Sequence, residues 1–140
     1  MRTIETDVII IGGGATGAGT VRDLSLRGIR AVLVEKDDIA FGTTGRNHGL
    51  LHSGARYAVN DLESARECIS ENRILKKIAA HCIEDTGGLF VTLPEDERTY
   101  HDKLLEGCRQ AGIKAEEISA REAFAIEPNL NRSIIRAIKV

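Results

Sequence analysis

Three glycines near the start of the chain have the type and spacing of a nucleotide-binding turn. Gly12, Gly14 and Gly17 form a G-x-G-x-x-G pattern directly after an apolar run. In such a turn the first glycine permits a tight bend, the second lets the main chain approach a diphosphate, and the third lets helix and strand pack closely. The N–H groups of the first helical turn, which contains Ala15 and Thr16, then point toward phosphate charge.

A carboxylate follows at the distance that a dinucleotide site requires. Glu35 ends a second apolar run, 21 residues after Gly14. A carboxylate at this place can accept hydrogen bonds from a ribose diol, which favours FAD or NAD over NADP, whose 2′-phosphate it would repel. Two alternatives stay open, namely a glycine-rich turn without a ligand and a Glu35 that is simply a solvated carboxylate at a strand end. The neighbouring Lys36 is also expected to be solvated.

The loop that follows is basic and rich in glycine. Residues 39–60 contain no Asp or Glu and carry Arg46, Arg56, His48 and His52, although the whole chain has a formal net charge of −2. A net-positive loop in an acidic protein is a candidate anion site. The alternatives are a surface ion pair for Arg56 and ordinary structural roles for the two histidines.

Two neighbouring threonines, Thr43 and Thr44, lie at the start of this loop. Their hydroxyl groups can donate hydrogen bonds to a diphosphate. They can equally well form a local turn or cap through bonds to the main chain. The residue types alone do not separate these two interpretations.

Alternating strands and helices are needed to hold these residues. The pattern predicts strands at 7–11 and 31–35 around a helix at 15–27 that Gly28 ends. Further predicted elements are helices at 61–81 and 97–111, a short helix after Ser119, and strands at 88–93 and 133–140, with capping boxes at Asn60–Glu63 and Ser119–Glu122. The fold class is therefore α/β. Four strands do not form one complete sheet, so we expect the chain to be an incomplete fold.

Composition excludes several classes of protein. The 140 residues include 19 Lys and Arg against 21 Asp and Glu, which argues against binding nucleic acid through its phosphates. The 42% hydrophobic share indicates a globular protein and not a disordered one. The longest apolar run, Val8–Ile11, is too short to span a membrane. Three widely spaced cysteines form neither a disulfide framework nor a metal-binding pair, so we expect no metal site and a cytoplasmic location.

Several stretches of the sequence resemble one family closely. They are DVIIIGGGATGAG, VLVEK, GTTGRNHGLLHSGARYAV and GLF-TLPED, which together extend over essentially the whole chain. They are similar to the flavin subunits of bacterial anaerobic glycerol-3-phosphate dehydrogenases, within the FAD-dependent oxidoreductases related to D-amino-acid oxidase. The most discriminating stretch is GRNHGLLHSGARY, because many flavin and NAD proteins share the glycine pattern.

The resemblance implies a Rossmann-like FAD-binding unit in residues 1–85 and the beginning of a substrate region in residues 86–140. Its implied FAD-binding residues are Gly12, Gly14, Ala15, Thr16, Gly17, Glu35, Lys36, Thr43, Thr44, Arg46, Asn47, Gly49, Leu50 and Leu51. His52 would lie near the isoalloxazine ring, as a possible catalytic residue. Arg56 and Tyr57 would hold the phosphate of the substrate.

The resemblance also implies a reaction and partners. Hydride would pass from C2 of sn-glycerol 3-phosphate to flavin N5, giving dihydroxyacetone phosphate, and electrons would leave through other subunits to membrane quinone. Those subunits could hold the protein at the inner face of the cell membrane. Family members are several times longer, so we expect an N-terminal fragment that is inactive alone. The alternatives are a flavin-dependent 2-hydroxy acid oxidase, such as one for L-2-hydroxyglutarate, and a non-catalytic remnant.

Overall fold

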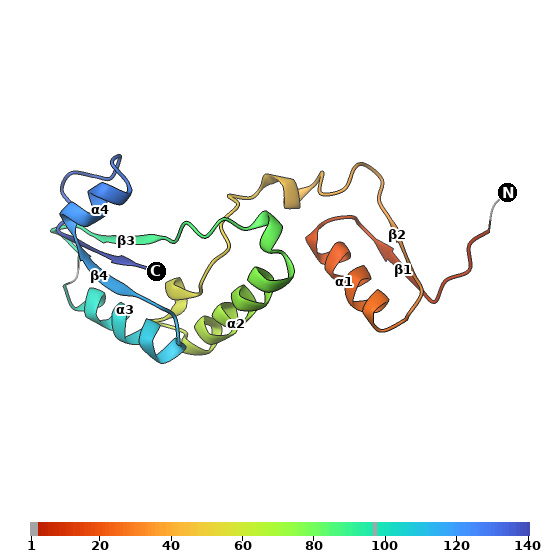
Figure 1. Ribbon diagram of the computed structural model, residues 1–140, viewed down its shortest axis with the longest axis horizontal. Coiled ribbons are helices and arrows are strands. Elements are labelled where there is room, and N and C mark those ends of the chain that lie inside the picture. Colours follow the sequence, from red (N-terminus) through yellow and green to blue (C-terminus); the bar gives the residue numbers. More distant parts are fainter. Residues whose placement is uncertain (1–2, 97) are drawn as a thin grey trace. The chain divides into compact units, whose positions relative to one another are not determined.

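The computed structural model describes residues 3–96 and 98–140. They form two compact units, one that ends at Gly49 and one that spans Leu50–Val140 (Figure 1). The predicted boundary between residues 85 and 86, which separates a cofactor domain from a substrate region, stays a prediction. The expectation that the strands do not complete one sheet is confirmed for the described residues, which hold one two-stranded and one three-stranded sheet.

The first unit is a βαβ arrangement. Strand β1 (Val8–Ile11) and strand β2 (Ala31–Val34) pair in parallel, and helix α1 (Ala15–Leu26) connects them. These bounds confirm the predicted elements to within a residue at each end. Helix α1 ends as predicted, because Gly28 adopts a positive φ of 73°, which glycine tolerates better than other residues.

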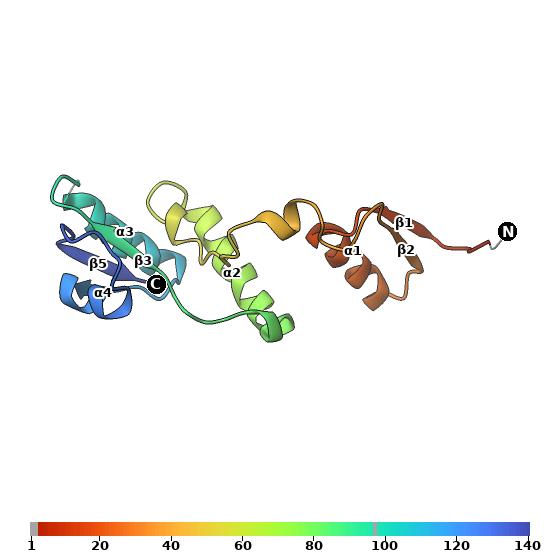
Figure 2. The same cartoon turned by 90° about the horizontal axis from the view of Figure 1, so that it is seen from above.

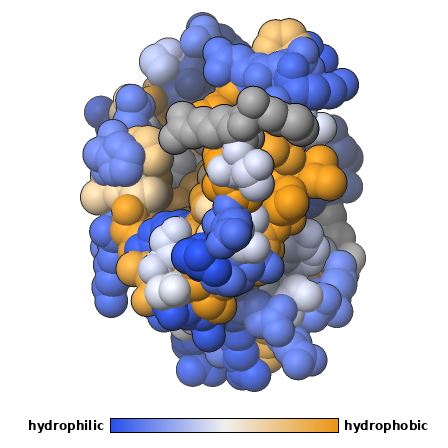
Figure 3. Space-filling view, turned by 90° about the vertical axis from the view of Figure 1, so that its right-hand side faces the viewer, coloured by the Kyte–Doolittle hydropathy of each residue, from blue (hydrophilic) through white to orange (hydrophobic). Residues whose placement is uncertain are grey.

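One face of this two-stranded sheet is covered and the other is open. The side chains of Val8 and Ile10 are partly buried on the side of α1, and alternate residues point the other way. On the open side Ile9 and Ile11 are 65% and 88% exposed. Figure 3 is a space-filling view from the right-hand side of Figure 1, and apolar side chains gather at the surface there. The sheet therefore has an apolar face that nothing in the described residues of its unit covers.

The second unit is built on a three-stranded antiparallel sheet. Its strands are β3 (Leu89–Thr92), β4 (Glu116–Ser119) and β5 (Arg136–Lys139), and the order β3-β5-β4 puts the last strand in the centre. Its helices are α2 (Leu62–Ile78), α3 (Arg98–Ala111) and α4 (Ala120–Ile126), with short 3-10 turns at Ala55–Tyr57 and Ala80–Cys82. A further 3-10 turn, Thr43–Arg46, belongs to the first unit.

Helices cover both faces of this sheet. Ile138 of β5 packs with Leu104 and Cys108 of α3, whereas the adjacent Ala137 packs with Ala123 of α4. Successive residues of a strand point to opposite faces, so α3 and α4 must lie on opposite sides, as Figure 2 shows. The second unit thus has a buried core on each side of its central strand.

Three sequence predictions for this unit need correction. Strand β4 is missing from the prediction, because its residues Glu116 and Glu117 give no apolar run. The predicted strand at 133–140 is shorter in the structure, because β5 spans Arg136–Lys139, with main-chain bonds continuing from Ile135 to Thr92 and between Val140 and Gly88. Helix α2 is capped by Asp61, whose side chain accepts from the N–H of Ser64, since Asn60 still belongs to the preceding turn. The capping box at Ser119 and Glu122 is confirmed.

Candidate functional site

The glycine turn of the first unit has the geometry that its residue types predict. Gly12 has a φ of 109°, a conformation that side chains rarely adopt. A Cβ placed on Gly17 would overlap the carbonyl oxygen of Gly12 and would lie 3.5 Å from Ile10 Cγ2. Only a glycine at position 17 therefore lets α1 start this close to β1. Ala15 and Thr16 form the exposed first turn of α1, beside the bend.

Glu35 contacts this turn directly. Its Oε2 accepts a 2.6 Å hydrogen bond from Gly13 N–H, and its Oε1 accepts from the N–H groups of Lys36 (2.7 Å) and Asp37 (3.1 Å). Led by the bond from Gly13, these donors lower the pKa of Glu35 below its ordinary value of 4.5. A carboxylate has about four acceptor positions, so this anion can still accept a hydroxyl hydrogen. These contacts favour a role of Glu35 at the turn over the interpretation that it is only a solvated carboxylate at a strand end.

Thr44 caps the first turn of α1 across a long stretch of sequence. Helix α1 has Gly14 as its N-cap residue and no side-chain cap of its own, and the hydroxyl of Thr44 accepts from Ala15 N–H at 3.0 Å. A Cβ on Gly14 would lie 2.9 Å from the same hydroxyl oxygen. A hydroxyl that accepts a hydrogen bond keeps its own hydrogen to donate. Thr44 can therefore cap the helix and donate to an anion at the same time.

The remaining predicted residues of the first unit lie on the loop around this cap. Asn47 closes the loop, because its side chain donates to the carbonyl of Thr44 (2.7 Å) and accepts from Gly49 N–H (2.6 Å). The guanidinium of Arg46 lies over the ring of Phe41, 5.6 Å from its centroid. Thr43 and Lys36 are exposed, and Lys36 lies 3.8 Å from the carboxylate of Asp37. The structure thus brings the side chains of Glu35 and Thr44 to the glycine turn, whereas the side chain of Lys36 points to Asp37.

Arg56 and Tyr57 lie on the 3-10 turn of the second unit, and both side chains are exposed. Their neighbours Ala55 and Ala58 are only 2% and 4% exposed and belong to the main core. Two small residues anchor this turn while the cation and the phenol face outward. Arg56 therefore lies exposed on a turn whose neighbouring residues are packed in the core.

Close packing on both sides holds this turn. Gly54 has a φ of 89°, and a Cβ there would lie 2.6 Å from the carbonyl oxygen of Ala65 in α2. A Cβ on Gly107 of α3 would overlap the carbonyl of Ala58. Helices α2 and α3 thus contact opposite ends of the turn through glycines. Gly107 is not predicted from the sequence, because a lone glycine inside a helical pattern has no local explanation.

Leu50, Leu51 and His52 open the second unit and are all exposed. Their main chain contacts a residue that the sequence pattern does not single out. Asn72 in the middle of α2 is only 6% exposed, and its Nδ2 lies within hydrogen-bonding distance of the carbonyls of Leu51 and His52. A polar amide at a core position of a helix is the one local signal that could have pointed to it.

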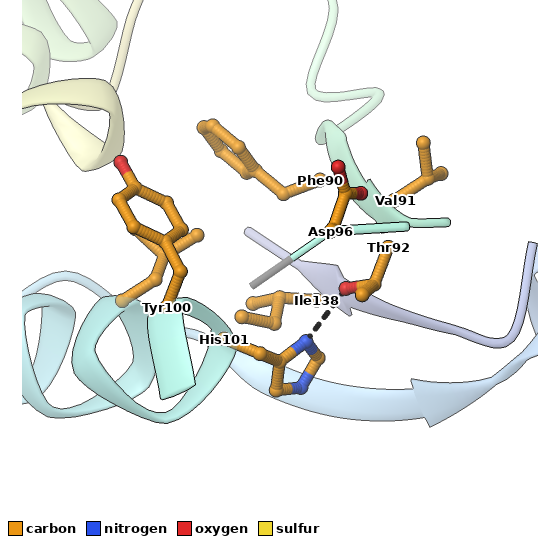
Figure 4. A pocket seen from close by; sticks show the side chains of 8 residues that line it. Phe90, Val91, Thr92, Asp96, Tyr100, His101 and Ile138 are labelled. Carbon is orange, nitrogen blue, oxygen red and sulfur yellow. Dashed lines mark hydrogen bonds between the residues drawn. The ribbon is translucent and has the colours of Figure 1, made fainter. Parts of the chain in front are cut away.

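A pocket of about 250 Å³ lies elsewhere in the second unit, between β3 and the first turns of α3 (Figure 4). His101 at its base is 3% exposed, and its Nδ1 lies 3.0 Å from the hydroxyl of Thr92. His101 Nε2 lies 3.5 Å from Glu117 Oε1 without making a hydrogen bond to a described residue. None of the residues predicted from the sequence to bind cofactor or substrate lines this pocket.

Comparisons with known proteins identify relatives for nearly the whole chain. Residues 7–139 match the family described as DAO, FAD dependent oxidoreductase. One of the subunits of anaerobic glycerol-3-phosphate dehydrogenase from Escherichia coli K12 is 64% identical over 136 residues, which are 97% of this chain and 25% of that protein. The chain thus spans about a quarter of the length of the curated relatives it matches. The resemblance stated from the sequence is confirmed.

Solved structures agree on the fold. L-proline dehydrogenase from P. horikoshii superimposes with a TM-score of 0.81 at 24% identity, covering 99% of this chain and 37% of that one. L-alpha-glycerophosphate oxidase from Mycoplasma pneumoniae, with FAD bound, superimposes with a TM-score of 0.73 at 25% identity, covering 98% and 38%. The α/β class with a Rossmann-like unit and the prediction of FAD as the cofactor are confirmed at the level of the family.

Proposed function

Because the chain belongs to the FAD-dependent oxidoreductase family, we propose that it forms the start of a flavoenzyme that oxidises sn-glycerol 3-phosphate to dihydroxyacetone phosphate. The observation that carries this proposal is the glycine turn, where Glu35 binds the N–H of Gly13 and Thr44 caps the following helix. Bound FAD would supply a two-electron acceptor for the alcohol carbon of the substrate. The residues of this chain would bind and orient both molecules.

The residues of the first unit fit a dinucleotide in chemistry and in space. The helix N-terminus and the capping hydroxyl of Thr44 suit the negative charge of a diphosphate. The positive φ of Gly12 disfavours a side chain there, and a Cβ on Gly17 would overlap the carbonyl oxygen of Gly12. Glu35 suits a ribose hydroxyl, because its carboxylate can accept the hydrogen that the hydroxyl donates. We further propose, from the family resemblance, that Leu50, Leu51 and His52 belong to the flavin site.

Arg56 is the proposed ligand of the substrate phosphate. A guanidinium offers a planar fork of N–H donors that matches phosphate oxygens, whereas an ammonium is a compact point charge. Arg56 is exposed on a turn that two glycines and two buried alanines hold in place. Tyr57 is 46% exposed beside it and can add a hydroxyl donor. This placement suits a residue that must meet a small anion from solvent.

The proposal is tested in a full-length chimera, in which this chain replaces the matching segment of the Escherichia coli relative. We expect the chimera to show flavin absorbance and to oxidise glycerol 3-phosphate. Oxidation of 2-hydroxyglutarate instead would favour the hydroxy acid oxidase. A colourless, protease-sensitive protein would favour a non-catalytic remnant. Either result would overturn the proposal.

Arg56→Lys in the chimera should raise the KM for glycerol 3-phosphate by about tenfold or more, because one charge-assisted bond of a bidentate pair contributes roughly 1.5 kcal/mol. The value of kcat should change much less. Steady-state kinetics check this, with Arg121→Lys as the control, because Arg121 is an exposed arginine on α4. An unchanged KM in the Arg56 variant would exclude the phosphate role.

Glu35→Gln in the chimera should weaken FAD binding about tenfold at neutral pH, since it removes charge-assisted hydrogen bonds. The folded pKa of Glu35 lies below the ordinary value of 4.5, so the carboxylate stabilises the turn fully above that pH and loses this effect as the pH falls below it. The difference in FAD affinity between parent and variant should therefore shrink in acid. Flavin retention measured from pH 7 downward checks this, and a constant difference would contradict it.

The proposed partners follow from the name of the Escherichia coli relative. That protein is named as one subunit of a dehydrogenase, and we propose that other subunits take electrons from this chain toward quinone. Among residues 3–96 and 98–140, no helix has the length and apolar character needed to cross a bilayer. We also propose that those subunits hold the protein at the inner face of the cell membrane.

A further inference from the structure

Helix α2 contains one buried amide, and that amide faces the main chain of the loop before the Arg56 turn. Nδ2 of Asn72 lies 3.2 Å from the carbonyl oxygen of His52 and 3.4 Å from that of Leu51. Both neighbours are acceptors, so the donor end of the amide must face them. An NH₂ group has two hydrogens and can bind both carbonyls at once. Asn72 is 6% exposed and both bonds are partly buried, which limits competition from water.

The same face of α2 contacts the loop at a second place. Gly54 packs against Ala65 and Cys68, where a Cβ would lie 2.6 Å from the Ala65 carbonyl oxygen and 2.8 Å from Cys68 Cβ. Positions 65, 68 and 72 are spaced by three and four residues, which places them in one row along the helix. The loop between residues 51 and 54 is therefore held at both ends by one rigid element.

We propose that Asn72 is a positioning residue, which fixes the main chain at Leu51 and His52 and thereby the direction of the His52 side chain. This inference rests on the proposed function, in which His52 lies beside the flavin ring. The hydrogen bonds of Asn72 go to the carbonyl of His52 itself and to the one before it, so they define the peptide planes on both sides of its Cα. At the other end of the loop Gly54 has a φ of 89°, a conformation that glycine adopts more readily than other residues.

The test uses Asn72→Asp in the full-length chimera. The substitution keeps the size of the side chain but replaces the donor by an acceptor that repels both carbonyls. A small displacement of a group that must meet the reacting atoms costs up to about a hundredfold in rate. We expect kcat to fall about tenfold to a hundredfold while FAD stays bound. If the Asp variant does not yield soluble protein, Asn72→Ser provides the same readout.

Arg73→Met is the matched control, because Arg73 is the next residue of α2 and donates a 2.6 Å bond to the carbonyl of Gly112 at the end of α3. Like Asn72→Asp, the Arg73→Met substitution removes a hydrogen bond between a side chain and a carbonyl, but this bond does not involve the loop at residues 51–54. We expect Arg73→Met to lower the Tm and to leave kcat within about twofold. An equal fall of kcat in both variants would show a general loss of stability and would overturn the inference.

A double variant separates positioning from structure. If Asn72 acts through His52, then Asn72→Asp combined with His52→Ala should have nearly the kcat of His52→Ala alone, because coupled residues are not additive. Additive losses, or an unchanged kcat in Asn72→Asp, would overturn the inference. The proposed function fails separately, when the unmodified chimera does not oxidise glycerol 3-phosphate. A normal kcat in His52→Ala would exclude the role of His52 and with it this use of Asn72.

Discussion

Gly17→Ala in the chimera should lose at least about a hundredfold in FAD affinity, which corresponds to roughly 2.7 kcal/mol. A Cβ at this position would overlap the carbonyl oxygen of Gly12 and would lie 3.2 Å from its carbonyl carbon. Both atoms belong to the main chain, so no side chain can rotate away. Helix α1 must then move from β1, and the N–H groups of its first turn move with it. Overpacking of this kind costs typically 1–3 kcal/mol in stability as well.

Gly19→Ala is the matched control for this prediction. Gly19 lies in the same helix, and a Cβ there meets nothing within 4 Å. Alanine is the better helix former, so this variant should be as stable as the parent or more stable by up to about 1 kcal/mol. The ratio of flavin to protein absorbance after gel filtration measures retention. Equal flavin content in the two variants would refute the assignment of this turn to the cofactor.

Gly107→Ala is the second variant with a large expected effect, and it acts on the second unit. The new Cβ would overlap the main chain of Ala58, and it would lie 3.1 Å from the Ala58 side chain. Helix α3 and the Arg56 turn must separate, which disturbs the main core through Ala55 and Ala58. We expect a loss of roughly 1–3 kcal/mol in stability and a rise of about tenfold or more in the KM for glycerol 3-phosphate.

The control for the second variant is Gly88→Ala. A Cβ at Gly88 would make only an ordinary contact, 3.5 Å from Val140 Cγ2. Thermal unfolding and steady-state kinetics of both chimeric variants should separate them. A Gly107 variant with normal stability would show that α3 can move away from the turn without cost. A normal KM with lowered stability would show that the close approach at Gly107 does not set the position of Arg56.

The first unit could be predicted almost completely from the sequence. The bounds of its strands, its helix and its glycine turn follow from short-range apolar patterns and from the steric needs of single glycines, although β1 and β2 themselves pair between distant segments. The G-x-G-x-x-G spacing therefore indicates both the bend at Gly12 and the close approach at Gly17, which the structure shows. The resemblance, which is most specific in residues 45–57, then added the family, which the comparisons confirm.

The second unit depends more on contacts that local patterns do not predict. Strand β4 exists because β5 pairs with it, and its acidic residues give no local sign of a strand. The predicted helix at 61–81 carries Asn72, whose importance depends on carbonyls about twenty residues earlier in the chain. Gly107 is understood only when Ala58 is seen against it. Each of these features is a contact between segments that are distant in sequence.

By itself, the sequence determined the chemistry of the residues, the positions of most elements and the family, because these depend on side-chain type and on short-range spacing. Only the tertiary structure decided that Glu35 binds the N–H of Gly13, that Thr44 caps α1, and that α2 and α3 hold the Arg56 turn. The physical reason is that packing and hydrogen bonding between distant segments depend on how the whole chain folds. Local patterns do not contain that information.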